Sequence, residues 1–150
     1  MSKLVVGLGS EMRGDDGAGP AVARRVAARL TAGGVHVVVP ADPLDLLDLW
    51  DGVELAVLID AVRGGPAVGA LCVLEPERAD LRVWRDAAST HEMDVRTVLH
   101  LARALGRGPL RAVVVGIAGE DFRPGAGLSQ PVQHALDAAA QAVLRLLGAA

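Results

Sequence analysis

The stretch Leu4–Ala21, LVVGLGSEMRGDDGAGPA, decides the fold of this chain because it joins a buried strand to a helix through a glycine turn. The apolar run over residues 3–8 is typical of a buried strand. Gly7-Leu8-Gly9 allows a tight turn, since glycine adopts a positive φ without steric cost. Gly19-Pro20 then opens a helix, with the proline in the first turn. We therefore expect a strand, a glycine loop and a helix in succession.

The rest of the chain continues this alternation. Apolar runs predict four more strands, over residues 35–39, 55–59, 69–74 and 111–117. Three more helices are expected: one starting at Asp42-Pro43, one after the capping box Ser89-Thr90-His91-Glu92, and one capped by Ser129. Helices and strands thus alternate along the whole chain.

Two expectations concern how the strands end and pair. Asp60 directly follows the third apolar run, and we expect it to terminate that strand. Only a few residues separate Asp60 from the run over residues 69–74, whereas a parallel crossover needs a dozen or more. That fourth strand is therefore expected to pair antiparallel with its predecessor. The predicted fold is α/β: a three-layer sandwich with a five-stranded, mostly parallel twisted sheet, one antiparallel strand, and helices on both faces.

Composition restricts the classes of function. The 150 residues fit one domain, 1–150, without a linker or repeat. A net charge of −3 and 2% aromatic residues argue against nucleic acid as a partner, and no apolar run is long enough for a membrane span. A single cysteine, Cys72, and the absence of a signal-peptide pattern indicate a cytoplasmic protein. We expect it to act as a monomer.

Three regions distant in sequence supply candidate functional side chains. Asp15 and Asp16 follow the first strand, Asp60 follows the third, and His91 precedes a helix. In such sheets the functional crevice lies at the carboxyl ends of the strands, so these groups are expected to meet there. Carboxylates with an imidazole can bind a borderline divalent ion or carry out acid/base chemistry. Each residue alone also has a structural interpretation, such as an aspartate near a helix start or a solvated loop histidine.

Familiar motifs of other functional classes are incomplete or absent. The glycine turn begins like a dinucleotide fingerprint, but Met12 stands where the third glycine belongs, and no P-loop lysine follows. There is no G-x-S-x-G elbow, and Cys72 lies in an apolar run, so a serine or cysteine nucleophile has little support. The other histidines, His36, His100 and His134, lack an acidic neighbour in sequence and are interpreted as structural.

Taken together, the motifs resemble the hydrogenase maturation endopeptidases, which trim the C-terminus of the large subunit of nickel–iron hydrogenases after nickel insertion. The resemblance covers nearly the whole chain in family order. It is carried by Gly7-Leu8-Gly9, Arg13-Gly14-Asp15-Asp16-Gly17-Ala18-Gly19-Pro20, Ile59-Asp60-Ala61, Thr90-His91, Val115-Gly116-Ile117 and Gly127-Leu128-Ser129.

This resemblance implies roles for particular residues. Asp16, Asp60 and His91 would contact nickel and form the catalytic site, with Asp15 as possible support. The nickel would arrive with the substrate, the large-subunit precursor, and no organic cofactor is expected. Two departures concern Ser10, where the family commonly has Asn, and Ala41-Asp42-Pro43, where it often has a Gly-Gly-Thr-like segment. The second departure bears on substrate specificity.

Two other functions remain open at the level of sequence. One is a non-catalytic module of the same fold that checks or handles nickel. The other is a small nucleotide-binding domain that uses the glycine turn and the helix start. Release of a peptide from a nickel-loaded precursor would distinguish the enzyme from the module, and calorimetry that shows tight nucleotide binding without a metal response would favour the nucleotide-binding domain.

Overall fold

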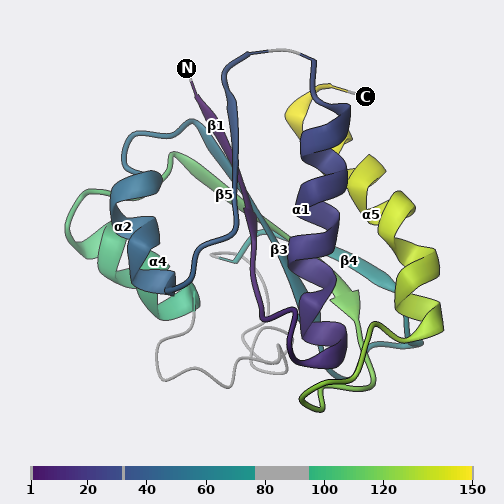
Figure 1. Ribbon diagram of the computed structural model, residues 1–150. Coiled ribbons are helices and arrows are strands. Elements are labelled where there is room, and N and C mark those ends of the chain that lie inside the picture. The colour runs from purple at the N-terminus through teal and green to yellow at the C-terminus, as the bar shows by residue number, and fades with distance from the viewer. Residues whose placement is uncertain (1, 32, 77–94, 150) are drawn as a thin grey trace.

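The computed structural model describes residues 2–31, 33–76 and 95–149. The chain starts with strand β1 (Lys3–Gly7), continues through a short 3-10 helix, η1 (Gly14–Gly17), and enters helix α1 (Ala18–Arg29). The strand, glycine loop and helix expected from the first stretch are thus confirmed. In Figure 1 the turn after β1 lies at the lower end of the sheet.

The other elements follow the predicted alternation. The remaining strands are β2 (Val35–Val38), β3 (Leu55–Val62), β4 (Leu71–Leu74) and β5 (Arg111–Ala118). The remaining helices are η2 (Pro43–Asp45), α2 (Leu46–Leu49), α4 (Val95–Ala104) and α5 (Gln130–Leu147). Asp42 caps η2 as expected, because its Oδ1 accepts a hydrogen bond from Leu44 N at 2.9 Å.

The five strands form one sheet in the order β2-β1-β3-β5-β4. All neighbouring pairs are parallel except β4 and β5, which are antiparallel. Figure 1 shows α1 and α5 on one face of the sheet and α2 and α4 on the other. The α/β fold with helices on both faces and one antiparallel strand is therefore confirmed.

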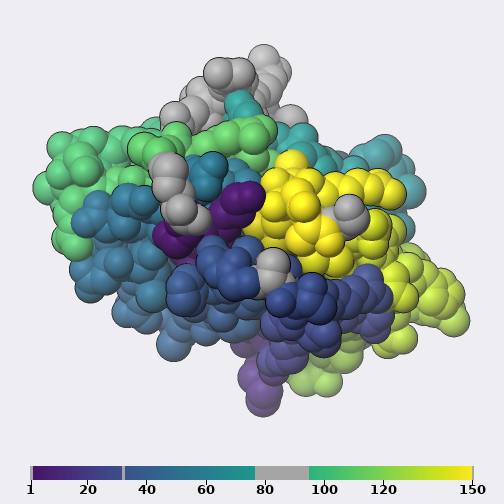
Figure 2. Space-filling model, turned by 90° about the horizontal axis from the view of Figure 1, so that it is seen from above, coloured from purple at the N-terminus to yellow at the C-terminus, as the bar shows by residue number. Residues whose placement is uncertain are grey.

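Alternating side chains divide the core into two layers. Val5, Val57 and Val113 pack with α1 and α5, whereas Val6 and Leu58 pack with α2 and α4. Strands that are apolar on both faces are typical of a parallel sheet covered by helices on both sides. At the amino ends of the strands, seen in Figure 2, the start of β1 lies against the end of α5, where Lys3 Nζ donates a hydrogen bond to Leu147 O at 2.9 Å.

Two details of the predicted sheet are wrong. Asp60 does not end the third strand: it lies within β3 opposite Gly116, because parallel pairing with β5 continues as far as Val62 and Ala118. The fourth strand does run antiparallel, but its partner is β5 and not its predecessor β3. The edge of β3 is already occupied by β5 along eight residues of each strand, so β4 can only add outside β5.

Within the described part of the chain, no helix combines the length and the apolar character needed to cross a membrane. The predicted capping box over residues 89–92 lies outside the described residues. The helix expected after it is present as α4.

Candidate functional site

The glycine turn after β1 folds back onto the acidic pair. Gly9 has a φ of 115°, and a β-carbon at this position would overlap the carbonyl oxygen of Asp16. A β-carbon there would also lie 3.0 Å from Asp16 Oδ1. Only glycine combines this positive φ with so close an approach. The turn therefore holds the Asp16 side chain against the carboxyl end of β1.

Asp16 is nearly buried, with 7% of its surface exposed. Its Oδ2 accepts a hydrogen bond from Ser10 N at 2.7 Å, which fixes the orientation of the carboxylate. The hydroxyl of Ser10 has a different use, since Oγ accepts a hydrogen bond from Met12 N at 3.2 Å. Ser10 thus orients Asp16 through its backbone, and its side chain closes the loop locally.

Asp60 lies close enough to Asp16 for the two carboxylates to repel each other. Its side chain points to the face of the sheet opposite to that of Ile59 and Ala61, and it is only partly exposed. Desolvation raises the pKa of Asp60 well above its usual range, and the negative charge of Asp16 raises it further, against a smaller lowering by a hydrogen bond from the Ala61 backbone. The structure therefore brings two of the three predicted ligands together at the carboxyl ends of β1 and β3.

Asp15 has a different role from its neighbour. Its carboxylate is completely buried and accepts hydrogen bonds from Glu120 N at 2.9 Å and from Asp121 N at 3.2 Å. It also accepts from Ser129 N at 2.7 Å and from the Ser129 hydroxyl at 2.9 Å. Asp15 therefore joins the loop after β1 to the loop after β5 and supports the site through these contacts.

These contacts correct the expected role of Ser129. It stands at the N-cap position of α5, but its side chain makes no capping hydrogen bond to the helix. The hydroxyl instead donates a charge-assisted hydrogen bond to the buried Asp15 carboxylate, which fixes the orientation of the Ser129 side chain. The position of the helix start was correct and the capping contact was wrong.

His91 lies outside the described residues, so its part in the site stays a prediction. Among the side chains that the structure does describe, no three histidine, cysteine or acidic groups gather at a point where they could hold a metal ion. The other histidines, His36, His100 and His134, are exposed. Cys72 is half-buried, and desolvation raises the pKa of its thiol, which disfavours a thiolate nucleophile there.

The donor set of the described pair suits a cation. Two carboxylates that repel each other in a partly desolvated site gain stability when a positive charge is placed between them. Oxygen donors alone favour hard ions, and an imidazole would extend the preference to borderline ions such as nickel. The same pair, with one pKa raised beside an ionised neighbour, is also suited to acid/base chemistry.

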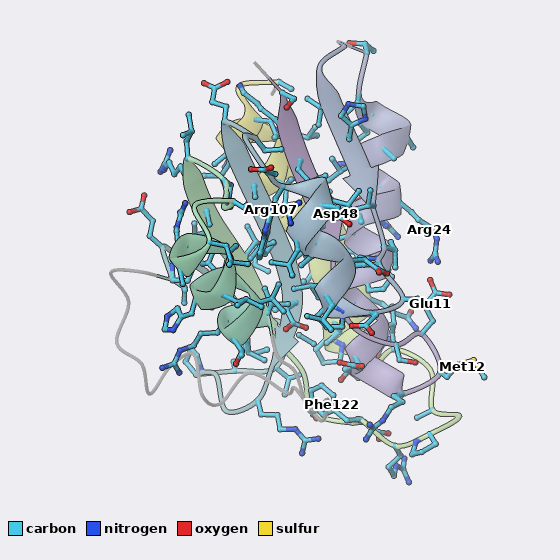
Figure 3. All side chains as sticks on the ribbon, turned by 90° about the vertical axis from the view of Figure 1, so that its left-hand side faces the viewer. Glu11, Met12, Arg24, Asp48, Arg107 and Phe122 are labelled. Atoms are coloured by element: carbon cyan, nitrogen blue, oxygen red, sulfur yellow. The ribbon has the colours of Figure 1, made fainter. Side chains whose placement is uncertain are left out.

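A cleft of about 670 Å³ lies at the same end of the molecule, and it was not anticipated from the sequence. It is lined by Arg13, Arg63, Glu120, Asp121, Phe122, Arg123 and Pro124. The guanidinium carbon of Arg63 lies 4.4 Å from the centre of the Phe122 ring. Figure 3 shows Phe122 at the lower end of the sheet. Arg63 directly follows β3, so the rule that selected Asp60 would also have selected it.

Comparison with known proteins identifies one protein family by sequence and a set of solved structures with the same fold. The family model described as hydrogenase maturation protease matches residues 21–146. A sequence comparison with curated proteins gives no match. The loop with the acidic pair lies just before the matched range.

Several solved structures resemble this one over almost their full length. A hydrogenase maturating endopeptidase HybD from E. coli is 22% identical with a TM-score of 0.83, covering 98% of this chain and 92% of the other. A nickel–iron hydrogenase maturation protease HybD from Thermococcus kodakarensis is 26% identical with a TM-score of 0.78, covering 97% and 99%. A hydrogenase 2 maturation peptidase from a Thaumarchaeota archaeon is 28% identical with a TM-score of 0.70, covering 100% of both chains.

Proposed function

Because this chain belongs to the hydrogenase maturation protease family, we propose that it removes a C-terminal peptide from the large-subunit precursor of a nickel–iron hydrogenase after nickel insertion. Family membership makes the chain a hydrolase of peptide bonds in hydrogenase maturation. The cleavage at the C-terminus and its dependence on nickel are the parts that we propose.

The observation that carries this proposal is the placement of Asp16 in the loop after β1 and of Asp60 in the neighbouring strand β3, where the charge of Asp16 contributes to the raised pKa of Asp60. Folding places these two carboxylates together in a partly desolvated site, at a cost that a bound cation would remove. Asp60 shares its face of the sheet with Leu58, and this face is covered by α2 and α4. His91 precedes the first residue of α4, Val95, by four positions, which supports it as the third ligand.

The nickel is proposed to be part of the substrate. Hydrogenase cysteines would hold it in the precursor, and Asp16, Asp60 and His91 would complete its coordination when the two proteins meet. A bound metal ion can polarise a carbonyl or a water as a Lewis acid. The residues of this chain would fix the scissile bond beside the site, and much of the rate enhancement would come from that positioning.

An alternative within the same site is direct acid/base catalysis by the aspartates. The raised pKa of Asp60 beside Asp16 favours a carboxyl that exchanges a proton nearer to neutral pH than an ordinary aspartate does. In this case nickel would serve as the recognition element, and an aspartate would activate the water.

The test is a processing assay on the large-subunit precursor encoded in the same genome, prepared with and without nickel. Mass spectrometry should detect release of a short C-terminal peptide from the nickel-loaded precursor only. Asp16→Asn, Asp60→Asn and His91→Ala should each slow this release by at least about a hundredfold, the scale of losing an acid/base or metal-positioning group. His134→Ala, an exposed histidine on α5, is the matched control and should process normally.

Two results would overturn the proposal. Normal processing by all three site variants would exclude the site. Binding of nickel-loaded precursor without peptide release, under conditions in which both proteins are folded, would instead indicate a module that checks nickel without cleaving.

A further inference from the structure

The cleft formed by the loops after β1, β3 and β5 carries three guanidinium groups, from Arg13, Arg63 and Arg123, and two carboxylates. One of these carboxylates is already neutralised. Asp121 Oδ1 accepts from Arg123 Nε at 2.8 Å and Oδ2 accepts from a terminal nitrogen of the same guanidinium at 2.7 Å. This pairing lowers the pKa of Asp121 to about 2. With that pair cancelled, the exposed Arg63 still presents a positive charge to the cleft.

Arg63 is the group best placed to receive a ligand. It is exposed, and it lies over the face of Phe122, whose own side chain is buried. Stacking on an aromatic ring fixes the plane of a guanidinium and leaves its edge, with the N–H donors, open to the cleft. A planar fork of donors matches a carboxylate, which it can bind through two parallel hydrogen bonds.

The position of Phe122 is itself set by the active-site support. A β-carbon at Gly119 would lie 2.8 Å from Asp15 Cβ and 2.9 Å from Phe122 Cζ, so Asp15 and Phe122 both pack closely against this glycine. The Asp15 carboxylate also holds the backbone of Glu120 and Asp121, two residues that line the cleft. The cleft and the acidic pair are thus built on one set of loops.

The chain order leads from the acidic pair into the cleft on two sides. Arg63 follows Asp60 by three residues, and Arg13 precedes Asp16 by three. An endopeptidase must hold the chain on both sides of the bond that it cuts. The segment removed from a precursor's C-terminus always ends in a carboxylate, and acidic side chains would add more.

We propose that this cleft binds the C-terminal extension of the precursor, with Arg63, positioned by Phe122, receiving a carboxylate of that extension and the exposed Pro124 contacting its apolar groups. The proposal rests on the proposed function, because it identifies the cleft as the place for the segment to be removed. It makes Arg63 a determinant of substrate affinity, outside the group of residues that contact the metal.

The first test measures binding without cleavage. A synthetic peptide with the sequence of the precursor's C-terminal extension is titrated into the full-length protein in three forms: with a free C-terminus, with an amidated C-terminus, and with every Asp and Glu replaced by Asn and Gln. Isothermal titration should show that Arg63→Gln weakens binding of the unmodified peptide by about tenfold, the scale of one charge-assisted bidentate contact. The modified form that loses the same factor identifies which carboxylate Arg63 binds.

Arg145→Gln is the matched control. Arg145 is an exposed arginine in the last turn of α5, at the opposite end of the molecule from the cleft, and its replacement removes the same charge. This variant should bind the unmodified peptide as the wild type does. Equal weakening by both variants would show general charge attraction and overturn the proposal, as would unchanged binding by Arg63→Gln.

The second test separates this proposal from the proposed function. In the processing assay, Arg63→Gln should raise KM several-fold and leave kcat nearly unchanged, because the residue binds the tail without touching the metal. Arg63→Lys keeps the charge but not the fork, and it should recover only part of the affinity. If the wild type cleaves the precursor and Arg63→Gln does so with the same KM, the cleft proposal fails alone. If the wild type does not cleave, the proposed function fails, and the peptide titration still decides whether the cleft binds a carboxylate.

Discussion

The Asp15 carboxylate receives both the backbone N–H and the hydroxyl of Ser129, at 2.7 and 2.9 Å, although the two residues lie 114 positions apart. With the donors from Glu120 and Asp121, four hydrogen bonds converge on one completely buried carboxylate. Such a group is held by its partners and could not be buried without them. Asp15 is therefore a structural residue, and Asp16 beside it faces the functional site.

Asp15→Asn is expected to destabilise the protein by about 2–3 kcal/mol, because an amide presents hydrogens to some of the four donors and leaves them unsatisfied. Chemical denaturation followed by circular dichroism measures this change in the free energy of unfolding. Ser129→Ala, which removes only the hydroxyl, should cost about 1 kcal/mol. Asp48→Asn is the control, since Asp48 forms an exposed ion pair with Arg107 and should change the stability little. An Asp15→Asn protein as stable as the wild type would contradict this account.

Asp60→Asn is expected to have the opposite effect and to stabilise the metal-free protein at neutral pH. The folded state holds the proton of Asp60 more tightly than the unfolded chain does, because desolvation and Asp16 raise its pKa. Stability is therefore lost as the pH rises from about 3.9, the ordinary value for an unfolded aspartate, through the raised pKa of the folded state.

Unfolding free energies measured in EDTA across this pH range test the sign of the effect. The advantage of Asp60→Asn over the wild type should be largest at neutral pH and should vanish below about pH 3, where both states hold the proton. A constant difference between the two proteins at every pH would mean that the carboxyl does not titrate as described.

Nickel ions should stabilise the wild type increasingly as their concentration rises above the dissociation constant of the site. At a concentration ten times the dissociation constant, a ligand that binds only the folded state adds about 1.4 kcal/mol to the free energy of unfolding. A thermal-shift titration with nickel chloride should show an increase in Tm that is absent in Asp16→Asn and Asp60→Asn and reduced in His91→Ala. His134→Ala should respond as the wild type does, and the same shift in all five proteins would indicate binding elsewhere.

Gly9→Ala should disrupt the loop that positions Asp16. The substitution combines a φ of 115° with an overlap between the new β-carbon and the Asp16 carbonyl, and we expect a loss of about 3 kcal/mol or more. Gly52→Ala is the control, because Gly52 also has a positive φ, of 71°, but open space around it. Its cost should be limited to the backbone term of about 1 kcal/mol. Denaturation curves of the two variants give the loss in free energy of unfolding for each substitution. Equal losses would mean that the overlap at Gly9 has no effect.

The order and type of the elements could be predicted because they depend on local signals. Pro20, Asp42 and the apolar runs each act within a few residues, and all the corresponding elements are present. The pairing of β4 could not be predicted locally, because it depends on β5, which comes later in the chain and occupies the edge of β3. The pairing of β3 with β5 also explains why Asp60 lies inside its strand and not at the end.

The candidate site was only partly within reach of the sequence. Position at the carboxyl ends of strands was enough to select Asp16 and Asp60 together. It could not separate the roles of Asp15 and Asp16, since the difference arises from Ser129 and from the loop after β5. The contact between Arg63 and Phe122 was missed because the two residues lie 59 positions apart. No local sequence pattern indicates that a cation and an aromatic ring so far apart will meet. His91 stays a prediction.

The tie between Asp15 and Ser129 also has a consequence for biosynthesis. The acidic motif leaves the ribosome well before the donors that hold it, because those donors belong to residues 120–129, 105 to 114 positions later in the chain. Contacts between segments so far apart form late in folding. A nascent or truncated chain that lacks residues 120–129 therefore carries Asp15 without the donors that hold it, and the loop with the acidic pair reaches its final geometry only after those residues have joined the fold.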